Sequence, residues 1–324
     1  MGDDIHFERR GRAGVVTLDR EAALNAVTGA MVDRLAGQLA LWADDDAVAH
    51  VAIRAKGRAF SVGGDIRALY ERRHDPDLDF FRREYRLNSA IAHYSKPYVA
   101  LVHGLVMGGG VGVSLHGSHV VAGPGMAFAM PEVGIGFFPD VGATHMLPRL
   151  AGTLGMELAL TGRRLDAEEC LAAGVATHFC TDHDGVLERL ADHDDVEAAL
   201  VPFAAPEPGD PPSAHPAFRE PDVPSILRAA DETLARTLGA KSPTSLLVAH
   251  RQMREGAGLD FDAAMRLEFR IVSRILHGHD FYEGIRAQVI DKDREPRWRP
   301  SHLEDVDPAV VAAHFEPLAE ELAL

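Results

Sequence analysis

The chain has 324 residues, of which 46% are hydrophobic, and its formal net charge at pH 7 is −16. A chain of this length can bury a full core, either as one large domain or as two smaller ones. The acidic balance argues against nucleic acid or an anionic membrane surface as the main partner. A local arginine cluster could still hold an anionic ligand.

The cysteine content and the N-terminal residues indicate the cellular compartment. The two cysteines, Cys170 and Cys180, form neither a CxxC motif nor a secreted disulfide pattern. The N-terminus is acidic and lacks both the order of a signal peptide and the Arg/Ser-rich character of a transit peptide. No apolar run approaches the ~20 residues that span a bilayer. We therefore expect a reduced, cytoplasmic protein without a membrane partner.

The N-terminal elements alternate in type. Residues 5–10 and 14–18 have the composition of short strands, residues 22–43 place apolar side chains at helical spacing, and residues 50–55 form another strand-like run. This order favours a mixed α/β architecture.

Two glycine-rich turns, FSVGGD at residues 60–65 and MGGG at residues 107–110, each precede an expected helix. Each could point backbone N–H groups at one oxygen. Two such donors would make an oxyanion hole, in which each contributes ~3 to 4 kcal/mol to transition-state stabilisation. The alternative is that the glycines only allow close packing. The presence of two such turns favours the oxyanion hole. Neither turn is a dinucleotide fingerprint, a P-loop or a serine hydrolase elbow.

Glu132 and Asp140 are the best catalytic candidates. They stand eight residues apart in a glycine-rich region that is otherwise almost uncharged, where a carboxylate is expensive to bury. Apolar neighbours would partly desolvate Glu132, raise its pKa and suit it to proton transfer. The alternative is a helix cap or a pair with an arginine such as Arg149, which is more plausible for Asp140. By pattern alone, Glu84 on the helix expected at residues 80–94 is a surface residue.

The C-terminal half is mainly helical. Residues 182–195 are rich in acids and histidines, and we favour a solvated surface loop over a metal site because EF-hand spacing and an HExxH helix are both absent. Proline-rich residues follow. We predict a core at 1–200, a linker or loop at 201–224 and a helical region at 225–324, with no bound metal.

Several motifs together resemble the crotonase (enoyl-CoA hydratase/isomerase) superfamily and, within it, the 3-hydroxyisobutyryl-CoA hydrolase branch. They are FSVGGDIR, HGLVMGGGVG, MPEVGIGFFPDVGATHMLPRLAG, LALTGRRLDAEECLAAGVATHF, SPTSL and HGHDFYEGIRAQVIDKDREPRW. The resemblance covers nearly the whole chain except residues 181 to about 241. It implies an α/β fold built as a spiral of ββα turns, followed by a C-terminal helical region.

The resemblance also implies site residues. The thioester oxygen would meet the N–H groups of Gly64 and Gly109, and the backbone at Ser61 would meet the adenine of the acyl-CoA substrate. Hydratases of the superfamily use two glutamates; one matches Glu132, but Gly112 stands at the position of the other.

The hydrolase branch has an aspartate where Asp140 stands and a substrate-binding glutamate where Glu84 stands. The implied activity is hydrolysis of a short branched 3-hydroxyacyl-CoA, most simply 3-hydroxyisobutyryl-CoA, in valine breakdown, with no cofactor beyond the CoA of the substrate. Glu132 would act as nucleophile or as base, and Asp140 and Glu84 would bind the substrate. The alternatives are an enoyl-CoA hydratase and a non-catalytic acyl-CoA-binding protein. Homo-oligomers occur in the superfamily, and one is possible here.

Overall fold

The computed structural model describes residues 4–203 and 209–324. The chain groups into two compact units, each built from three segments. Unit 1 comprises Met1–Gly64, Arg86–Phe128 and Arg164–Pro212, and unit 2 comprises Asp65–Tyr85, Ala129–Arg163 and Ser213–Leu324. The division at 201–224 stays a prediction, and residues 204–208 of that predicted linker lie outside the described part.

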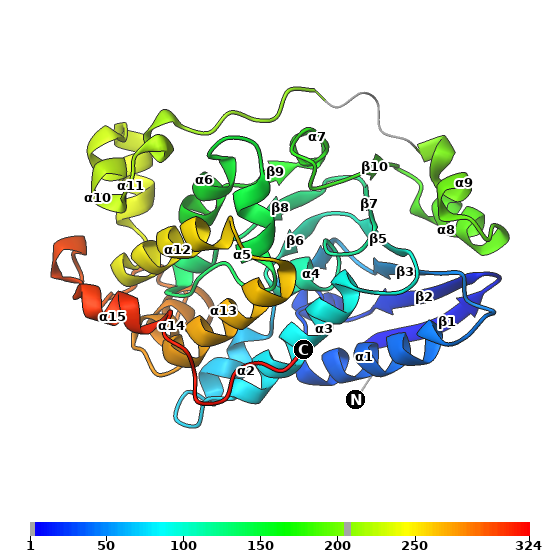
Figure 1. Cartoon of the computed structure of the whole chain (residues 1–324), viewed down its shortest axis with the longest axis horizontal. Coiled ribbons are helices and arrows are strands. Elements are labelled where there is room, and N and C mark those ends of the chain that lie inside the picture. Colours follow the sequence, from blue (N-terminus) through cyan, green and yellow to red (C-terminus); the bar gives the residue numbers. More distant parts are fainter. Residues whose placement is uncertain (1–3, 204–208) are drawn as a thin grey trace. The chain divides into compact units, whose positions relative to one another are not determined.

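Unit 1 contains a six-stranded sheet in the order β1-β2-β3-β5-β7-β10 (Figure 1). β1 is antiparallel to β2, and the pairs from β2 onward are parallel. The strands are β1 (Ile5–Arg10), β2 (Ala13–Leu18), β3 (His50–Ala55), β5 (Tyr98–Val102), β7 (His119–Ala122) and β10 (His178–Phe179).

A second sheet of four strands follows the order β4-β6-β8-β9. Its strands are β4 (Ala59–Ser61), β6 (Leu105–Met107), β8 (Ala127–Ala129) and β9 (Leu165–Asp166). Each of the consecutive pairs β3–β4, β5–β6 and β7–β8 places one strand in each sheet, and helical turns come next in the chain. This repeat confirms the predicted spiral of ββα turns.

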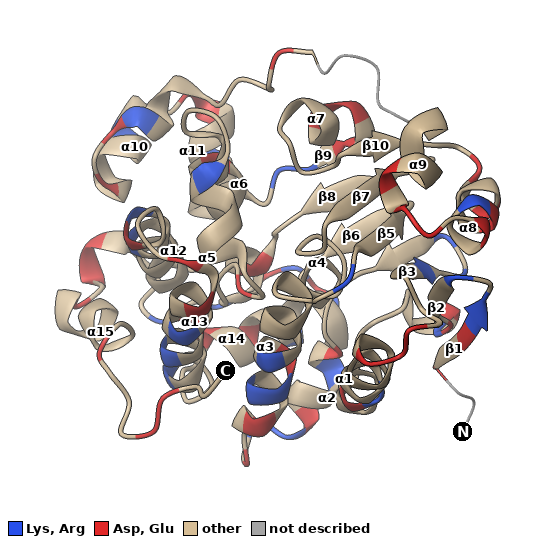
Figure 2. Ribbon diagram, turned by 45° about the vertical axis from the view of Figure 1, so that its right-hand side comes forward, with Lys and Arg blue, Asp and Glu red and all other residues tan. Residues whose placement is uncertain are grey.

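The inner strands of the two sheets are largely buried because they are composed of uncharged, mostly apolar residues. β5, β6, β7 and β8 carry no charged residue, as the uninterrupted tan colour in Figure 2 shows. Every residue of β5 is buried. Parallel strands covered on both faces read as continuous apolar runs, which is the pattern seen here.

The helix predicted at residues 22–43 is shorter than expected. α1 (Gly29–Ala43) begins after Thr28, whose side chain accepts a hydrogen bond from the Met31 N–H. Before it, Leu24 and Asn25 have φ values of 51° and 56°, which no helix allows. The Asn25 side chain instead donates to the carbonyls of Lys56 and Ala59. A tertiary hydrogen-bond network therefore overrides the local helical pattern.

The prediction of a surface loop at residues 182–195 is wrong. The segment forms α8 (His183–Asp192), followed by α9 (Val196–Leu200), and Asp182 caps α8 by accepting from the Gly185 N–H. Val186, Leu187 and Leu190 of α8 are buried against the six-stranded sheet in the core of unit 1. These residues lie on one helical face, and their burial outweighs the polar composition around them.

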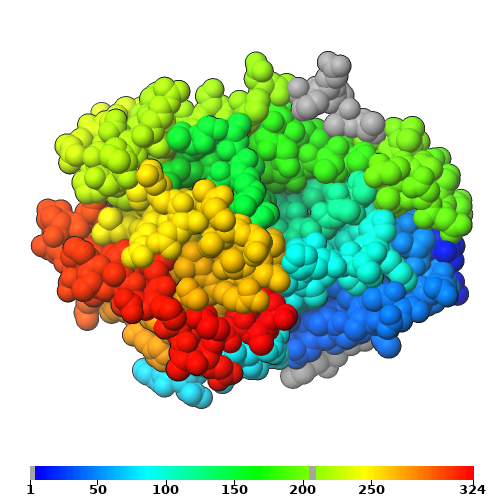
Figure 3. Space-filling view, viewed as in Figure 1, coloured from blue at the N-terminus to red at the C-terminus, as the bar shows by residue number. Residues whose placement is uncertain are grey.

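Unit 2 is mostly helical. Its helices are α2 (Ile66–Glu71), the first part of α3 (Leu78–Ala92), α5 (Ala143–Met146), α6 (Leu154–Thr161), α10 (Val223–Ala229), α11 (Glu232–Gly239), α12 (Pro243–Gly256), α13 (Phe261–Ile275), α14 (Asp280–Ile285) and α15 (Pro308–Ala313). One apolar cluster joins residues of α6, α10, α11 and α12. The C-terminal residues lie along α13, where Arg270 pairs with Glu321, and Figure 3 shows this red segment beside the orange helix.

The described part of the chain contains no helix that is both long and apolar enough to cross a membrane.

Candidate functional site

The two predicted catalytic carboxylates come from one irregular segment between β8 and α5, in unit 2. Glu132 opens a 3₁₀ turn, Glu132–Ile135, that ends at Gly136 in the left-handed region with φ 70°. Asp140 precedes Val141 and Gly142, whose φ values are 53° and 94°. Both carboxylates are buried, with exposures of 7% for Glu132 and 5% for Asp140. Their burial agrees with the sequence analysis.

Helix α3 brings two further groups into this cluster. Glu84 is only 2% exposed, so the expectation from its pattern alone, a surface position, is wrong. Tyr85 is fully buried, and its hydroxyl donates a 2.8 Å hydrogen bond to Asp140 Oδ2. Asp140 therefore has a tyrosine partner. Arg149 instead donates to the carbonyls of His145, Gly256 and Leu259.

A fourth buried carboxylate was not predicted. Glu268 on α13 is 0% exposed, and its two oxygens accept the N–H groups of Gly142 and Thr144, each at 2.9 Å. A signal for it exists in the sequence, because Glu268 interrupts the apolar face of α13 between Ala264 and Val272. A charged residue in such a stripe is costly to bury unless it is hydrogen-bonded.

Burial dominates the electrostatics of this cluster. It raises the pKa of Asp140 to about 7 against the opposing hydrogen bond from Tyr85. Burial and then the Asp140 charge raise the pKa of Glu268 to about 8. The same two causes raise the pKa of Glu132 and of Glu84 well above the usual range, with Glu268 adding to the effect at Glu84.

Within the described residues none of these four carboxylates forms an ion pair with a lysine or arginine. The cluster therefore holds protons at a pH where exposed carboxyls are ionised.

Two oxygen atoms in the cluster have no partner within the described residues. They are Glu84 Oε1 and Glu132 Oε2, and both are buried. An unpartnered buried oxygen is costly, and such groups commonly serve a ligand or a bound water. Glu84 and Glu132 each keep one buried oxygen that has no partner among the described residues.

The two glycine-rich turns lie side by side in unit 1. A Cβ atom added at Gly63, which has φ +112°, would stand 3.5 Å from the Met107 carbonyl oxygen and 3.7 Å from the Gly109 nitrogen. Gly109 is the first residue of α4 (Gly109–Gly112), so its N–H has no acceptor inside that helix. The roles of Gly64 and Gly109 as oxyanion donors stay predictions.

Ser61 supports the first of these turns from inside unit 1. It is fully buried on β4, where its hydroxyl donates to the Asn25 carbonyl at 2.8 Å and accepts the Gly63 N–H at 3.3 Å. A contact of the Ser61 backbone with adenine stays a prediction.

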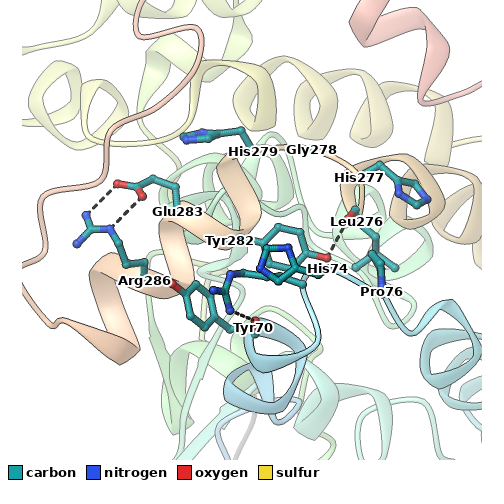
Figure 4. Close-up of a pocket in the computed structure, with 11 residues that line it drawn as sticks. Tyr70, His74, Pro76, Leu276, His277, Gly278, His279, Tyr282, Glu283 and Arg286 are labelled. Carbon is teal, nitrogen blue, oxygen red and sulfur yellow. Dashed lines mark hydrogen bonds and ion pairs between the residues drawn. The ribbon is translucent and has the colours of Figure 1, made fainter.

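A separate hollow of about 420 Å³ in unit 2 lies between the end of α2 and α14, and Figure 4 shows its lining. Arg73 stacks on the Tyr70 ring at 4.5 Å, and Arg286 forms two hydrogen bonds with Glu283. None of the residues that line this hollow is a predicted site residue.

The described residues contain no group of three or more His, Cys, Asp or Glu side chains that could hold a metal ion.

Known proteins resemble this chain over nearly its whole length. A family model described as enoyl-CoA hydratase/isomerase matches residues 13–315. A relative from Danio rerio named 3-hydroxyisobutyryl-CoA hydrolase, mitochondrial, is 40% identical, with 98% of this chain and 91% of the relative covered. The Homo sapiens protein of the same name is 36% identical, with 98% and 89% covered.

Solved structures carry other names. A carnitinyl-CoA dehydratase from Mycobacterium thermoresistibile shares 35% identity, with 99% of both chains covered and a TM-score of 0.91. An enoyl-CoA hydratase from Rhodobacter sphaeroides shares 37% identity, with 99% of this chain and 100% of that chain covered and a TM-score of 0.87. The fold, the matched family model and these relatives agree, and the chain belongs to the enoyl-CoA hydratase/isomerase family.

Proposed function

We propose that the protein hydrolyses the thioester of 3-hydroxyisobutyryl-CoA to 3-hydroxyisobutyrate and CoA. The relatives named for this reaction support the proposal at about 40% identity. The observation that carries it is the buried cluster, in which Glu132 keeps one oxygen free of any partner among the described residues and Asp140 is held by Tyr85.

Glu132 is the reacting group in this proposal, and two routes fit it. In the first, a Glu132 oxygen attacks the carbonyl carbon, the C–S bond breaks, and water then hydrolyses the anhydride. In the second, Glu132 removes a proton from the water that attacks. The CoA thiolate leaves and takes up a proton in both routes. Transfer of ¹⁸O from labelled water into Glu132 would identify the first route with attack of water at the glutamyl carbon of the anhydride, because the second route leaves the Glu132 oxygens unlabelled.

The remaining groups have binding and stabilising roles. The N–H groups of Gly64 and Gly109 would stabilise the oxyanion, which is typically worth about 3 kcal/mol per donor. Glu84 would bond the 3-hydroxyl of the substrate, and Asp140 would orient that hydroxyl or the water. The backbone at Ser61 would meet the adenine. The reaction as written needs no metal and no cofactor beyond the CoA of the substrate.

A second candidate is enoyl-CoA hydratase activity, which the names of the similar solved structures favour. Gly112 argues against it. This residue lies in α4 at the position of the second hydratase glutamate and supplies no carboxylate.

Parallel assays on one preparation separate the two candidates. Thiol release from 3-hydroxyisobutyryl-CoA with negligible hydration of crotonyl-CoA supports the hydrolase, and hydration without thiol release contradicts it.

Location and assembly stay proposals. We infer a cytoplasmic protein from its sequence, although the relatives named above are labelled mitochondrial. A homo-oligomer is proposed by family analogy alone, and sedimentation velocity tests it.

A further inference from the structure

One buried carboxylate has no role in the function proposed above. Each oxygen of Glu268 accepts one backbone N–H, from Gly142 through Oε2 and from Thr144 through Oε1. Two backbone donors, one on each oxygen, stabilise the ionised form, since a neutral carboxyl is a weaker acceptor on its hydroxyl oxygen. A glutamine there would turn one acceptor into an NH₂ group facing a backbone N–H.

The segment that Glu268 holds is the one that carries Asp140. Val141 has φ 53°, a conformation that β-branched residues rarely adopt and that persists only where the surroundings enforce it. A second helix restrains the same segment, because the Gln252 amide on α12 donates to the Pro139 carbonyl at 2.5 Å and to Thr144 Oγ1 at 2.7 Å. Asp140 thus stands between two anchored points.

Titratable groups surround Glu268. The groups that face it are Asp140 and Thr144 from the held segment and Glu84 and Tyr85 from α3. Burial and then the charge of Asp140 raise the pKa of Glu268 to about 8, and the same two causes contribute most to the raised pKa of Glu84.

We propose that Glu268 is a positioning residue for the reaction. Its two oxygens accept the N–H groups of Gly142 and Thr144 and hold the turn after Asp140, so that Asp140 stays hydrogen-bonded to Tyr85. This inference rests on the proposed function, because Glu84 and Asp140 are the substrate-binding groups there.

The test compares Glu268→Gln, which replaces one acceptor oxygen by an NH₂ group, with Glu268→Asp, which keeps both acceptor oxygens on a shorter side chain. Glu157→Gln is the matched control, because Glu157 is a buried glutamate of the same unit that pairs with Arg163 at 3.1 Å. The readouts are kcat and KM for thiol release from 3-hydroxyisobutyryl-CoA, the pH profile of kcat/KM, and the unfolding temperature.

Glu268→Gln should lower kcat/KM at least about tenfold and move the acidic limb of the pH profile to higher pH, because a displaced Asp140 loses the Tyr85 hydrogen bond that lowers its pKa. Glu268→Asp should lower kcat and move the profile in the same direction, because its shorter side chain weakens the same two hydrogen bonds. Glu157→Gln should change neither. A role confined to stability would lower the unfolding temperature without moving the profile.

Wild-type kcat and pH profile in a folded Glu268→Gln protein would overturn the inference. If that variant does not fold, Glu268→Asp decides, and wild-type kcat in it would overturn the inference equally. Failure of the wild-type protein to release thiol would instead count against the proposed function.

Discussion

Tyr85 and Asp140 are joined by a 2.8 Å hydrogen bond inside unit 2, where both side chains are buried. The tyrosine hydroxyl opposes the effect of burial, which raises the pKa of Asp140 to about 7. This contact joins a residue of α3 to the segment that also carries Glu132, the proposed reacting group, and it lowers the pKa of Asp140 against the larger effect of burial.

Tyr85→Phe should reduce kcat/KM by roughly 10- to 100-fold, because a hydrogen bond to a charged group contributes about 1.5 to 3 kcal/mol. The pKa of Asp140 should rise, and the acidic limb of the pH profile should move to higher pH. Tyr94→Phe is the control, since the Tyr94 hydroxyl donates to the Leu39 carbonyl in unit 1. An unmoved acidic limb in Tyr85→Phe would contradict this account.

Glu84→Leu should weaken discrimination for the substrate hydroxyl. It removes the carboxyl group whose Oε1 has no partner among the described residues. A site built to bond a hydroxyl rejects analogues without it, so the preference for 3-hydroxyisobutyryl-CoA over isobutyryl-CoA should fall at least about tenfold in kcat/KM. An equal loss on both substrates would show that Glu84 does not contact the hydroxyl.

Stability should fall as the pH rises through the neutral range. Burial raises the folded-state pKa of Asp140 to about 7 and of Glu268 to about 8, so the folded protein binds more protons than the unfolded chain above about pH 4. The contribution of these two groups to the free energy of unfolding is fully present below about pH 4. It falls by up to about 1.4 kcal/mol per pH unit for each group as the pH rises to 7 to 8.

Urea unfolding of the wild type and of Asp140→Asn at pH 5, 6, 7 and 8 measures this effect. The wild type should lose stability relative to the variant as the pH rises. A constant difference between the two proteins across this range would refute the shift.

Gly110→Ala should disturb the second glycine turn. Its Cβ would stand 2.7 Å from the Ser61 Cβ and 2.8 Å from the Ser61 carbonyl oxygen. Overpacking of this kind costs about 1 to 3 kcal/mol, and we expect kcat to fall with the stability. Gly37→Ala on α1 is the control, because nothing lies within 4 Å of its added Cβ and helix propensity favours alanine by up to about 1 kcal/mol. Unchanged stability and kcat in Gly110→Ala would contradict the tight packing of these turns.

Much of the candidate site could be predicted because its charged residues stand in apolar surroundings. Glu132 and Asp140 are isolated carboxylates in an apolar, glycine-rich stretch, and both are buried as expected. The paired glycine turns lie side by side, and the alternating strands form the expected spiral.

The rest depended on tertiary contacts that periodicity does not contain. Glu84 lies on a helix with charged neighbours, and only packing shows that it points to the buried side. Glu268 interrupts an apolar helix face, but the hydrogen bonds that hold it there come from a distant segment. α8 was missed because acids and histidines surround its three buried apolar residues. The start of α1 was misplaced because the Asn25 hydrogen bonds to Lys56 and Ala59 replace the first helical turns.

The most direct measurement is thiol release from 3-hydroxyisobutyryl-CoA by the wild type and by Glu132→Gln, with both proteins shown to be folded. The account predicts rapid release by the wild type and a fall of about 10² to 10⁴ in the variant, which lacks the group that reacts with the thioester or with water. Equal release by the two proteins would contradict the central role of Glu132. No release by either would contradict the hydrolase proposal itself.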